Sequence, residues 1–280
     1  MNWERAREAV PRLEVVAQTG STNDDIRAAL TGANAGAWSH GSTLVTDDQT
    51  AGRGRLGRVW MAPTGKTLAI STVVRPREVN RWLSPDALGW VPLIAGAAMT
   101  EAVANAVARA AERVERDDED GPGRREVGLK WPNDVQIAGY KVSGILSEFV
   151  SEASAVIVGA GLNLTLDEHD LPTLTSTSLL LATGEAPDAD EVLADYLRAF
   201  LAGFDRFAAA DGDAEASGIA GWVSSYCQTL GTDVRVILPD DSELVGLADR
   251  LDVTGRLVVI DRESGEHRAV AAGDVTHLRY

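Results

Sequence analysis

Apolar residues recur with two different periods along this chain, and turn residues divide it into elements. Segments rich in β-branched residues predict strands at 42–46, 67–74, 127–131, 135–138, 141–150 and 154–164. Longer segments with a period near 3.6 predict helices at 84–110, 188–210 and 214–227, and a Ser or Thr within 19–23 can cap another helix that follows. Since 154–164 is the most apolar of the strands, we expect it at the centre of the sheet.

Residues 232–280 follow another pattern, of short strands separated by turn pairs. These pairs are Pro239-Asp240, Thr254-Gly255, Ser264-Gly265 and Ala272-Gly273. The pattern changes near 228–231, directly after the last predicted helix. We therefore expect an α+β domain at 1–228 and a small β-barrel domain at 229–280.

The charge balance limits the partners of the chain. Its 280 residues include 26 Lys or Arg and 42 Asp or Glu, a net charge of −16, which argues against a general nucleic-acid binder. A single cysteine, Cys227, excludes an internal disulfide and a cysteine-rich metal site. Charged residues interrupt the N-terminus, and the apolar stretch 87–100 is too short to cross a bilayer, so we expect a cytoplasmic protein without a membrane segment. The acidic segment 112–126, which contains Gly-Pro-Gly, is predicted to be a surface loop.

One segment is strongly basic, in contrast to the acidic chain as a whole. Residues 49–77 contain no Asp or Glu and hold six basic residues, which are Arg53, Arg55, Arg58, Lys66, Arg75 and Arg77. Its centre is Gly-Arg-Gly-Arg-Leu-Gly-Arg (52–58). Glycines allow backbone N–H groups to approach an anion, and guanidinium groups are forked, permanently charged donors. The segment predicts a loop that wraps a phosphate or a carboxylate; the alternative is an ordinary basic surface loop.

Three nucleotide motifs resemble this loop without fitting it. The glycines of 52–57 match the dinucleotide fingerprint, but no helical period follows at 58–67. With Val59 they match a protein-kinase glycine loop, yet the sequence has no His-Arg-Asp and no Asp-Phe-Gly. Residues 65–67 resemble the end of a P-loop, but Trp60 stands where that motif requires glycine. The loop therefore binds anions by another scheme.

A second cluster, Lys130-Trp131-Pro132-Asn133-Asp134, lies between two predicted strands. Proline biases the residue before it away from helix, so the cluster falls where one strand ends and the next begins. There Lys130, Asn133 and Asp134 can point into one cavity beside the indole of Trp131. The alternative is a hairpin with an exposed polar turn.

Two further segments place small residues where a ligand needs room. In 141–146, strand alternation puts Lys141 and Ser143 on one face, and Gly144 leaves space beside them. Residues 159–163, Gly-Ala-Gly-Leu-Asn, end the predicted central strand.

Together these motifs resemble the biotin–protein ligases, a family that activates biotin and attaches it to a carboxylase carrier domain. Residues 52–60 match the family signature Gly-Arg-Gly-Arg-x-Gly-Arg-x-Trp at every fixed position, and 130–134 are similar to its second signature. The resemblance is strong over 19–164 and weaker over the C-terminal β unit. It implies a catalytic domain of the class II aminoacyl-tRNA synthetase/biotin synthetase type, with a mixed sheet flanked by helices, and then an SH3-like β-barrel.

The resemblance also assigns roles to residues. Biotin would be contacted by Ser21, Thr22, Asn23, Gln49, Arg53, Gly54, Arg55, Lys141 and Gly144. The nucleotide would be contacted by Arg55, Arg58, Trp60, Trp131, Asn133, Lys141 and Asn163. The catalytic residues would be Arg53, Arg55, Lys130, Asp134 and Lys141. No structural metal site is implied, and Mg²⁺ would enter with ATP, with Asp134 as a candidate ligand.

The implied reaction has two steps. The biotin carboxylate attacks the α-phosphate of ATP, which gives biotinyl-5′-AMP and pyrophosphate, and a carrier lysine then attacks the mixed anhydride. Two anions meet in the first step, so fixed positive charge from the loop arginines and Lys141, together with Mg²⁺, is expected to be needed. Asp134 either receives the proton of the attacking lysine or binds metal or nucleotide. Because water must not reach the anhydride, we expect 52–58 to be mobile until ligand binds.

Some members of this family carry an N-terminal helix-turn-helix domain and repress biotin genes. Only twenty residues precede Ser21 here, and the net charge is acidic, so no DNA binding is expected. The expected partner is the biotin carboxyl carrier domain of acetyl-CoA carboxylase or a related carboxylase, and the chain is expected to be a monomer or a weak homodimer. Two other functions stay open, a lipoate or octanoate ligase and a catalytically silent biotin-binding protein.

Overall fold

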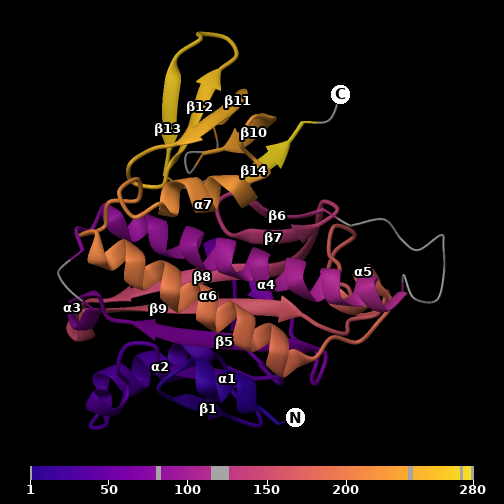
Figure 1. Cartoon of the computed structure of the whole chain (residues 1–280). Helices are drawn as coiled ribbons and strands as arrows, with labels where there is room; N and C mark the ends of the chain where they lie inside the picture. Colours follow the sequence, from indigo (N-terminus) through magenta and orange to yellow (C-terminus); the bar gives the residue numbers. More distant parts are fainter. Residues whose placement is uncertain (1, 80–82, 115–125, 239–241, 272–273, 279–280) are drawn as a thin grey trace.

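Seven strands form one mixed sheet within the residues that the computed structural model describes, 2–79, 83–114, 126–238, 242–271 and 274–278 (Figure 1). In order across the sheet they are β1 (Leu13–Val15), β2 (Thr43–Thr46), β5 (Thr67–Val74), β9 (Ala155–Asn163), β8 (Tyr140–Val150), β7 (Asp134–Ile137) and β6 (Val127–Lys130). β1 and β2 are parallel, and the other neighbouring strands are antiparallel. β9 is the middle strand, which confirms the prediction from its apolar sequence. Ala138 and Gly139 have positive φ angles and form the turn between β7 and β8.

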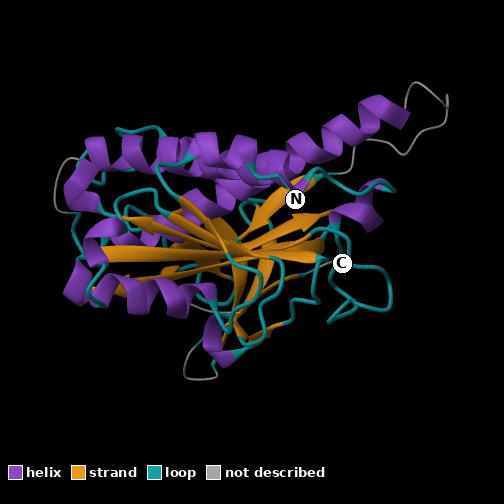
Figure 2. Cartoon of the chain, turned by 90° about the horizontal axis from the view of Figure 1, so that it is seen from below, coloured by secondary structure: helices purple, strands orange, loops and turns teal. Residues whose placement is uncertain are grey.

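Helices lie on both faces of this sheet (Figure 2). Because side chains alternate along a strand, Val73 and Val74 of β5 belong to two separate apolar clusters. Val73 packs with Ile26 and Leu30 of α2 (Thr22–Thr31). Val74 belongs to the larger cluster, to which α4 (Val91–Val114) and α6 (Ala189–Ala209) contribute. The polar residues described below lie on the α2 face.

The other described elements outside the two sheets and the three long helices are short. They are the helices α1 (Glu4–Ala9), α3 (Pro76–Val79), α5 (Leu179–Thr183) and α7 (Ile219–Tyr226), the hairpin strands β3 (Gly52–Arg53) and β4 (Val59–Trp60), and the 3-10 helices Ala35–Ala37, Arg55–Gly57, Ala87–Trp90 and Ser151–Ala153.

Two predicted helices have different bounds in the structure. The helix predicted from residue 84 begins at Val91, because the 3-10 helix Ala87–Trp90 precedes it. The Ser84 hydroxyl accepts the N–H of Ala87 at 3.1 Å in the turn that leads into this 3-10 helix. α4 continues to Val114, so residues 112–114 of the predicted surface loop 112–126 are helical, and residues 115–125 lie outside the described residues. By length and composition this helix could span a membrane, but 72% of its most apolar window is buried, as expected for a core helix. The helix predicted at 214–227 begins only after Gly218, whose φ of 73° is left-handed.

A second sheet follows α7. The strands β10 (Asp233–Ile237), β11 (Glu243–Leu251), β12 (Leu257–Asp261), β13 (His267–Val270) and β14 (Asp274–His277) are antiparallel, in the order β13-β12-β11-β10-β14. The predicted turns Thr254-Gly255 and Ser264-Gly265 join them, while Pro239-Asp240 and Ala272-Gly273 lie outside the described residues. Buried side chains of this sheet join the same apolar cluster as α4, so the second sheet rests on the main core.

Candidate active site

The arginine-rich segment folds back on itself as a hairpin. Gly52 pairs with Trp60 and Arg53 with Val59, and a 3-10 turn at Arg55–Gly57 joins the two strands. The turn needs left-handed backbone at Leu56 (φ 57°) and Gly57 (φ 73°). Leu56 is 73% exposed, so the tip of the hairpin stands in solvent. The hairpin presents its arginines near the tip and returns Trp60 to the sheet.

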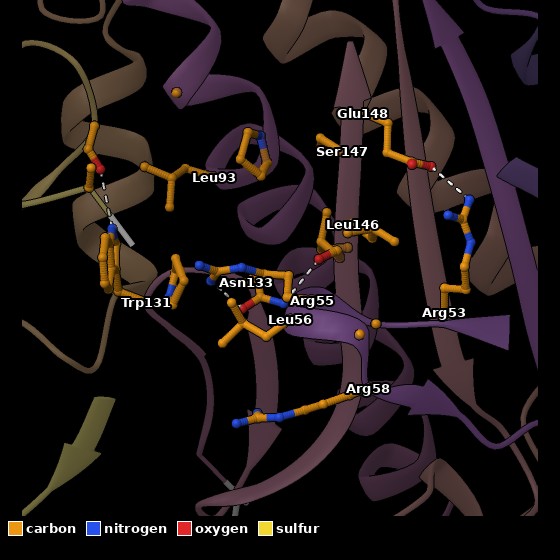
Figure 3. A pocket seen from close by; sticks show the side chains of 18 of the residues that line it. Arg53, Arg55, Leu56, Arg58, Leu93, Trp131, Asn133, Leu146, Ser147 and Glu148 are labelled. Carbon is orange, nitrogen blue, oxygen red and sulfur yellow. Dashed lines mark hydrogen bonds and ion pairs between the residues drawn. The ribbon is translucent and has the colours of Figure 1, made fainter. Parts of the chain in front are cut away.

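Two cavities adjoin this hairpin. The larger, about 1010 Å³, extends from the arginines across Leu93 and Trp131 to the turn Thr254–Arg256 of the second sheet (Figure 3). The smaller, about 350 Å³, is lined by Arg55, Trp60, the cluster 130–134, Lys141, Gly144, Asn163 and part of the loop after β9. Gly54, Arg55, Arg58 and Asn133 line both cavities, so the two are neighbouring parts of one site.

Glycines form the floor beside the smaller cavity. Across the sheet, Gly161 of β9 is the partner of Gly144 of β8, and Gly159 is the partner of Ser71 of β5. A Cβ atom on Gly161 would lie 2.2 Å from the indole of Trp60, and one on Gly159 would lie 2.5 Å from Oδ1 of Asn23. The glycines therefore let these two side chains lie directly on the strands.

A small recess on this floor holds the polar residues that precede and begin α2. It is lined by Ser21, Thr22, Asn23, Gln49, Trp60, Gly144, Leu146, Gly159 and Gly161, among others. Gln49 Oε1 accepts the N–H of Thr22 at 3.0 Å, whereas Ser21, at the N-cap, makes no side-chain cap hydrogen bond. The predicted Ser or Thr cap is thus wrong, because a side chain from a distant loop supplies the acceptor. Ser71 joins the network, with its hydroxyl 2.7 Å from the Thr22 hydroxyl and 2.6 Å from Asn23 Oδ1.

The cluster 130–134 meets Lys141 and the hairpin. Lys141 Nζ lies 2.6 Å from Asp134 Oδ1 and 5.8 Å from the ring centroid of Trp60. Asn133 accepts a hydrogen bond from Arg55 at 3.1 Å and donates one to the carbonyl of Ile145 at 3.0 Å. The structure therefore brings Arg55, Lys141 and Asp134 together at the smaller cavity, as the motifs predicted.

Arg53 takes a different direction from the other loop arginines. Its guanidinium forms ion pairs with Asp24 and Glu148 and lines the larger cavity, not the smaller one. Figure 3 shows Arg53 and Glu148 turned toward each other, with Arg58 on another side of the hairpin. In this arrangement Arg53 therefore lies apart from Lys141, while Arg55 lines the smaller cavity together with Lys141.

Trp131 and Asn163 are both buried and hydrogen-bonded to backbone carbonyls. Trp131 is only 2% exposed, and its indole N–H donates to the carbonyl of Gly255 at 3.2 Å. Its backbone N–H donates to the Thr229 hydroxyl at 2.9 Å. Asn163 donates to the carbonyl of Thr177 at 2.9 Å. Trp131 therefore connects the site to the second sheet, and Asn163 holds the loop after β9.

Lys66 anchors the same loop from its other side. Its ammonium lies 3.0 Å from Asp167 and 2.5 Å from Asp170. Hydrogen bonds to Asp170 and Asp167 raise the pKa of Lys66 above its usual value, so this clip stays charged at neutral pH. The clip belongs to the loop that supplies Thr173, Thr175 and Ser176 to the smaller cavity.

The carboxylate at the smaller cavity suits a metal ion whose other ligands come from a bound substrate. Among the described residues no group of three His, Cys, Asp or Glu could hold a metal ion. Asp134 is the acidic residue among those that line the smaller cavity. Mg²⁺ is often bound by one or two carboxylates together with substrate phosphates, and this donor set fits that mode.

Sequence reasoning missed Ser71, Asp24 and Glu148. Glu148 had a usable signal, because it follows Gly144 and Leu146 on the same face of a strand with period 2. Ser71 and Asp24 had none, since their roles depend on strand pairing and on the direction of Arg53.

Comparison with known proteins agrees with this geometry. The model of the biotin/lipoate A/B protein ligase family matches residues 15–163, more than half of the chain. The chain belongs to this family.

Three individual proteins illustrate the similarity. The biotin–[acetyl-CoA-carboxylase] ligase of Mycobacterium tuberculosis is 37% identical over 268 residues, which span 96% of this chain and 90% of that protein. The bifunctional ligase/repressor BirA of Bacillus subtilis is 33% identical over 166 residues, 57% of this chain and 45% of that one. The solved structure of the biotin protein ligase from Aquifex aeolicus in complex with biotin and ATP is 26% identical, has a TM-score of 0.70, and covers 96% of this chain and 100% of its own.

Proposed function

We propose that this protein is a biotin–protein ligase that modifies the carrier domain of acetyl-CoA carboxylase or a related carboxylase. The observation that carries the proposal is the juxtaposition of a polar recess floored by glycines with a cavity edged by Arg55 and Lys141. The recess offers hydroxyl and amide groups to a small polar ring, with Trp60 as an apolar wall. The cavity offers cations to a carboxylate and a phosphate. The relative from Mycobacterium tuberculosis bears the name of this activity.

In the first step, a carboxylate oxygen of biotin forms a bond to the α-phosphorus of ATP, and the bond from that phosphorus to the bridging oxygen of pyrophosphate breaks. Negative charge then develops on the phosphoryl oxygens and on the leaving group. The basic side chains that line the smaller cavity and can meet this charge are Arg55, Arg58, Lys130 and Lys141. Loss of one such preorganised donor typically costs about 10²–10³ in rate.

In the second step, a neutral carrier lysine attacks the anhydride carbon and expels AMP. A free lysine has a pKa near 10.4, so making it neutral at pH 7 costs about 4.6 kcal/mol. A carboxylate beside the anhydride lowers this cost by accepting the proton. We assign that role to Asp134, which Lys141 holds by their ion pair.

Further parts of the proposal concern cofactors and organisation. ATP is the cosubstrate, and Mg²⁺, held by its phosphates, would offset their negative charge. Residues 1–228 form the catalytic domain, of the class II synthetase type, and 229–280 an SH3-like unit. We also propose a cytoplasmic monomer or weak homodimer that binds neither DNA nor a membrane.

Biotin-dependent exchange of pyrophosphate into ATP tests the proposal, with lipoate and octanoate as alternative acids. Exchange with biotin alone supports it. Exchange with lipoate or octanoate keeps the chemistry and replaces the substrate. Folded protein with Mg²⁺ that exchanges with none of the three acids, yet binds biotin, would instead be a silent biotin-binding protein.

A further inference from the structure

Glu148 is a charged residue that contacts the site but belongs to none of the motifs. It lies on β8, two residues beyond Leu146 on the face that carries Gly144, and its side chain is 20% exposed. Its carboxylate accepts hydrogen bonds from Asn23 Nδ2 at 2.7 Å, from Arg27 at 3.1 Å and from Arg53 at 3.5 Å. It therefore connects the recess on the sheet with the first arginine of the hairpin (Figure 3).

The Asn23 side chain is held at both ends of its amide. Its Oδ1 accepts from the Ser71 hydroxyl at 2.6 Å, and its Nδ2 donates to Glu148. Asn23 is only 5% exposed and lies on Gly159. The two ends of a side-chain amide have nearly the same shape, so their hydrogen-bond partners decide which end points where.

Nδ2 of Asn23 also lies 3.5 Å from the carbonyl of Leu146, at the limit of hydrogen bonding. Among its partners, Glu148 at 2.7 Å is therefore the one that fixes the orientation most strongly. The Ser71 hydroxyl can donate or accept, and so it tolerates either end of the amide. An ionised carboxylate accepts only, and so it requires the NH₂ end of Asn23. The same carboxylate requires a donor from Arg53, and Asp24 holds that guanidinium from another direction. Two carboxylates and two arginines, Arg27 and Arg53, thus balance in charge at this edge of the site.

We infer that Glu148 is a positioning residue for biotin, which acts through Asn23 and Arg53 without touching the substrate. The inference rests on the proposed function and adds a residue to it. A recess that recognises a small polar ring needs its donors and acceptors in fixed places before the ligand arrives. Glu148 fixes one amide of the recess and the base of the hairpin that covers it. We expect ATP binding at the smaller cavity to depend less on these contacts, because Glu148 lines the larger cavity and not the smaller one.

The test is Glu148→Gln, which keeps the size of the side chain and removes its charge. We expect the KM for biotin in pyrophosphate exchange, and the calorimetric Kd for biotin without nucleotide, to rise about tenfold, as for other charge-assisted hydrogen bonds. The KM for ATP should change less than twofold. The matched control is Glu152→Gln, on an exposed carboxylate that bonds Ser151, lies near Arg27 and lines neither cavity. It should leave all three constants within twofold of the parent chain.

Each outcome has one meaning. If the parent chain binds no biotin and exchanges no pyrophosphate, the proposed function fails. If the parent chain is active and Glu148→Gln behaves like Glu152→Gln, the function stands and the positioning role is overturned. Equal increases in both KM values, or a lower melting temperature for Glu148→Gln alone, would show a general structural role and would also overturn it.

Discussion

At the scale of single residues, the site depends on two positions at which the strand has no side chain. Gly159 and Gly161 have no Cβ, and their places are filled by the amide of Asn23 and the indole of Trp60. Packed interiors leave little space, so one added carbon forces a neighbour to move. The two residues that form the walls of the recess are thus positioned by the strand beneath them.

Gly161→Ala tests this close packing. The new methyl would lie 2.2 Å from Trp60 Cε2, so the indole must move, at a cost of about 1–3 kcal/mol in the free energy of unfolding. We expect biotin binding, measured by titration calorimetry, to weaken at least tenfold. Gly221→Ala in α7, where nothing lies within 4 Å of the new methyl, is the control and should unfold no more easily than the parent chain. Unchanged biotin binding by Gly161→Ala would mean that Trp60 leaves the floor when ligand binds.

Asp134→Asn separates the two half-reactions. Asparagine keeps the shape of Asp134, which lies 2.6 Å from Lys141, but it cannot accept the proton of the carrier lysine. We expect transfer from preformed biotinyl-5′-AMP to a carrier domain to slow by about 10²–10⁴. Pyrophosphate exchange should fall by less than tenfold. The reverse result, with exchange lost and transfer intact, would assign Asp134 to the metal or the nucleotide.

At the scale of elements, the hairpin Gly52–Trp60 is held at its base, and Leu56 at its tip is exposed. Its base pairs Gly52 with Trp60, and Arg53 is tied to Asp24 and Glu148. Its tip, at Leu56, is exposed. Such a segment can move about its base and cover a ligand in the neighbouring cavity.

Limited proteolysis measures that movement. Trypsin cleaves after arginine, and Arg55 and Arg58 flank the exposed tip. We expect cleavage there without ligand and at least tenfold slower cleavage with biotinyl-5′-AMP, because the anion orders the guanidinium groups. Cleavage at Arg262, in the turn between β12 and β13, is the internal reference and should not change. Equal cleavage of the tip with and without ligand would contradict a loop that orders on binding.

The turn between β11 and β12 connects the second sheet to the site. Asp252 Oδ1 accepts hydrogen bonds from the N–H and hydroxyl of Thr254 and from the N–H of Arg256. The carbonyl of Val253 accepts from Trp90, and that of Gly255 from Trp131. Burial alone would raise the pKa of Asp252, but these hydrogen bonds outweigh it and the pKa is lowered.

Asp252→Ala should therefore destabilise the chain in a pH-dependent way. At pH 7 we expect a loss of about 1 kcal/mol in the free energy of unfolding, as for a lost helix cap. Because the folded pKa is lowered, the unfolded chain takes up its proton first, near pH 4, as the pH falls. The stabilisation by Asp252 then declines as the pH drops through the folded pKa. Urea unfolding at pH 7 and at pH 3.5 should show the difference between the two chains shrinking, and a constant difference would refute the linkage.

The elements that could be predicted from the sequence are those that depend on residues close together in the chain. The apolar run of β9 and the Ala138-Gly139 turn follow from composition over a few residues. The first turn of α2 could not be predicted in this way, because its acceptor is Gln49. The contact of Trp131 with Gly255 spans 124 residues of sequence, and the direction of Arg53 depends on Glu148, 95 residues away. The motifs therefore located the site, while the contacts between its residues required the fold.

At the scale of the whole molecule, the arginines of the hairpin lie at a cavity although the chain as a whole is acidic. The chain carries a net charge of −16, while the three arginines of the hairpin, Arg53, Arg55 and Arg58, line a cavity. Within that cavity Asp24, Asp86 and Glu148 stand among the arginines. A small anion can enter between these groups, because fixed donors act at short range and the overall field is screened beyond about 10 Å. A long polyanion meets the acidic exterior as well.

This arrangement of charge predicts that the chain does not bind DNA. Duplex binding draws most of its affinity from many phosphate contacts, each with the release of a counterion. Here the guanidinium groups of the hairpin line a cavity, and Arg53 is already paired with acids. We expect no change in the anisotropy of a labelled biotin-operator duplex at 150 mM salt, with or without biotinyl-5′-AMP. The titration should extend to about 10 μM protein, a concentration at which nonspecific DNA-binding proteins already associate with DNA. A labelled carrier domain, measured in the same way, should give a change. Saturable binding of the duplex that weakens as salt is added would show a basic surface that the net charge conceals.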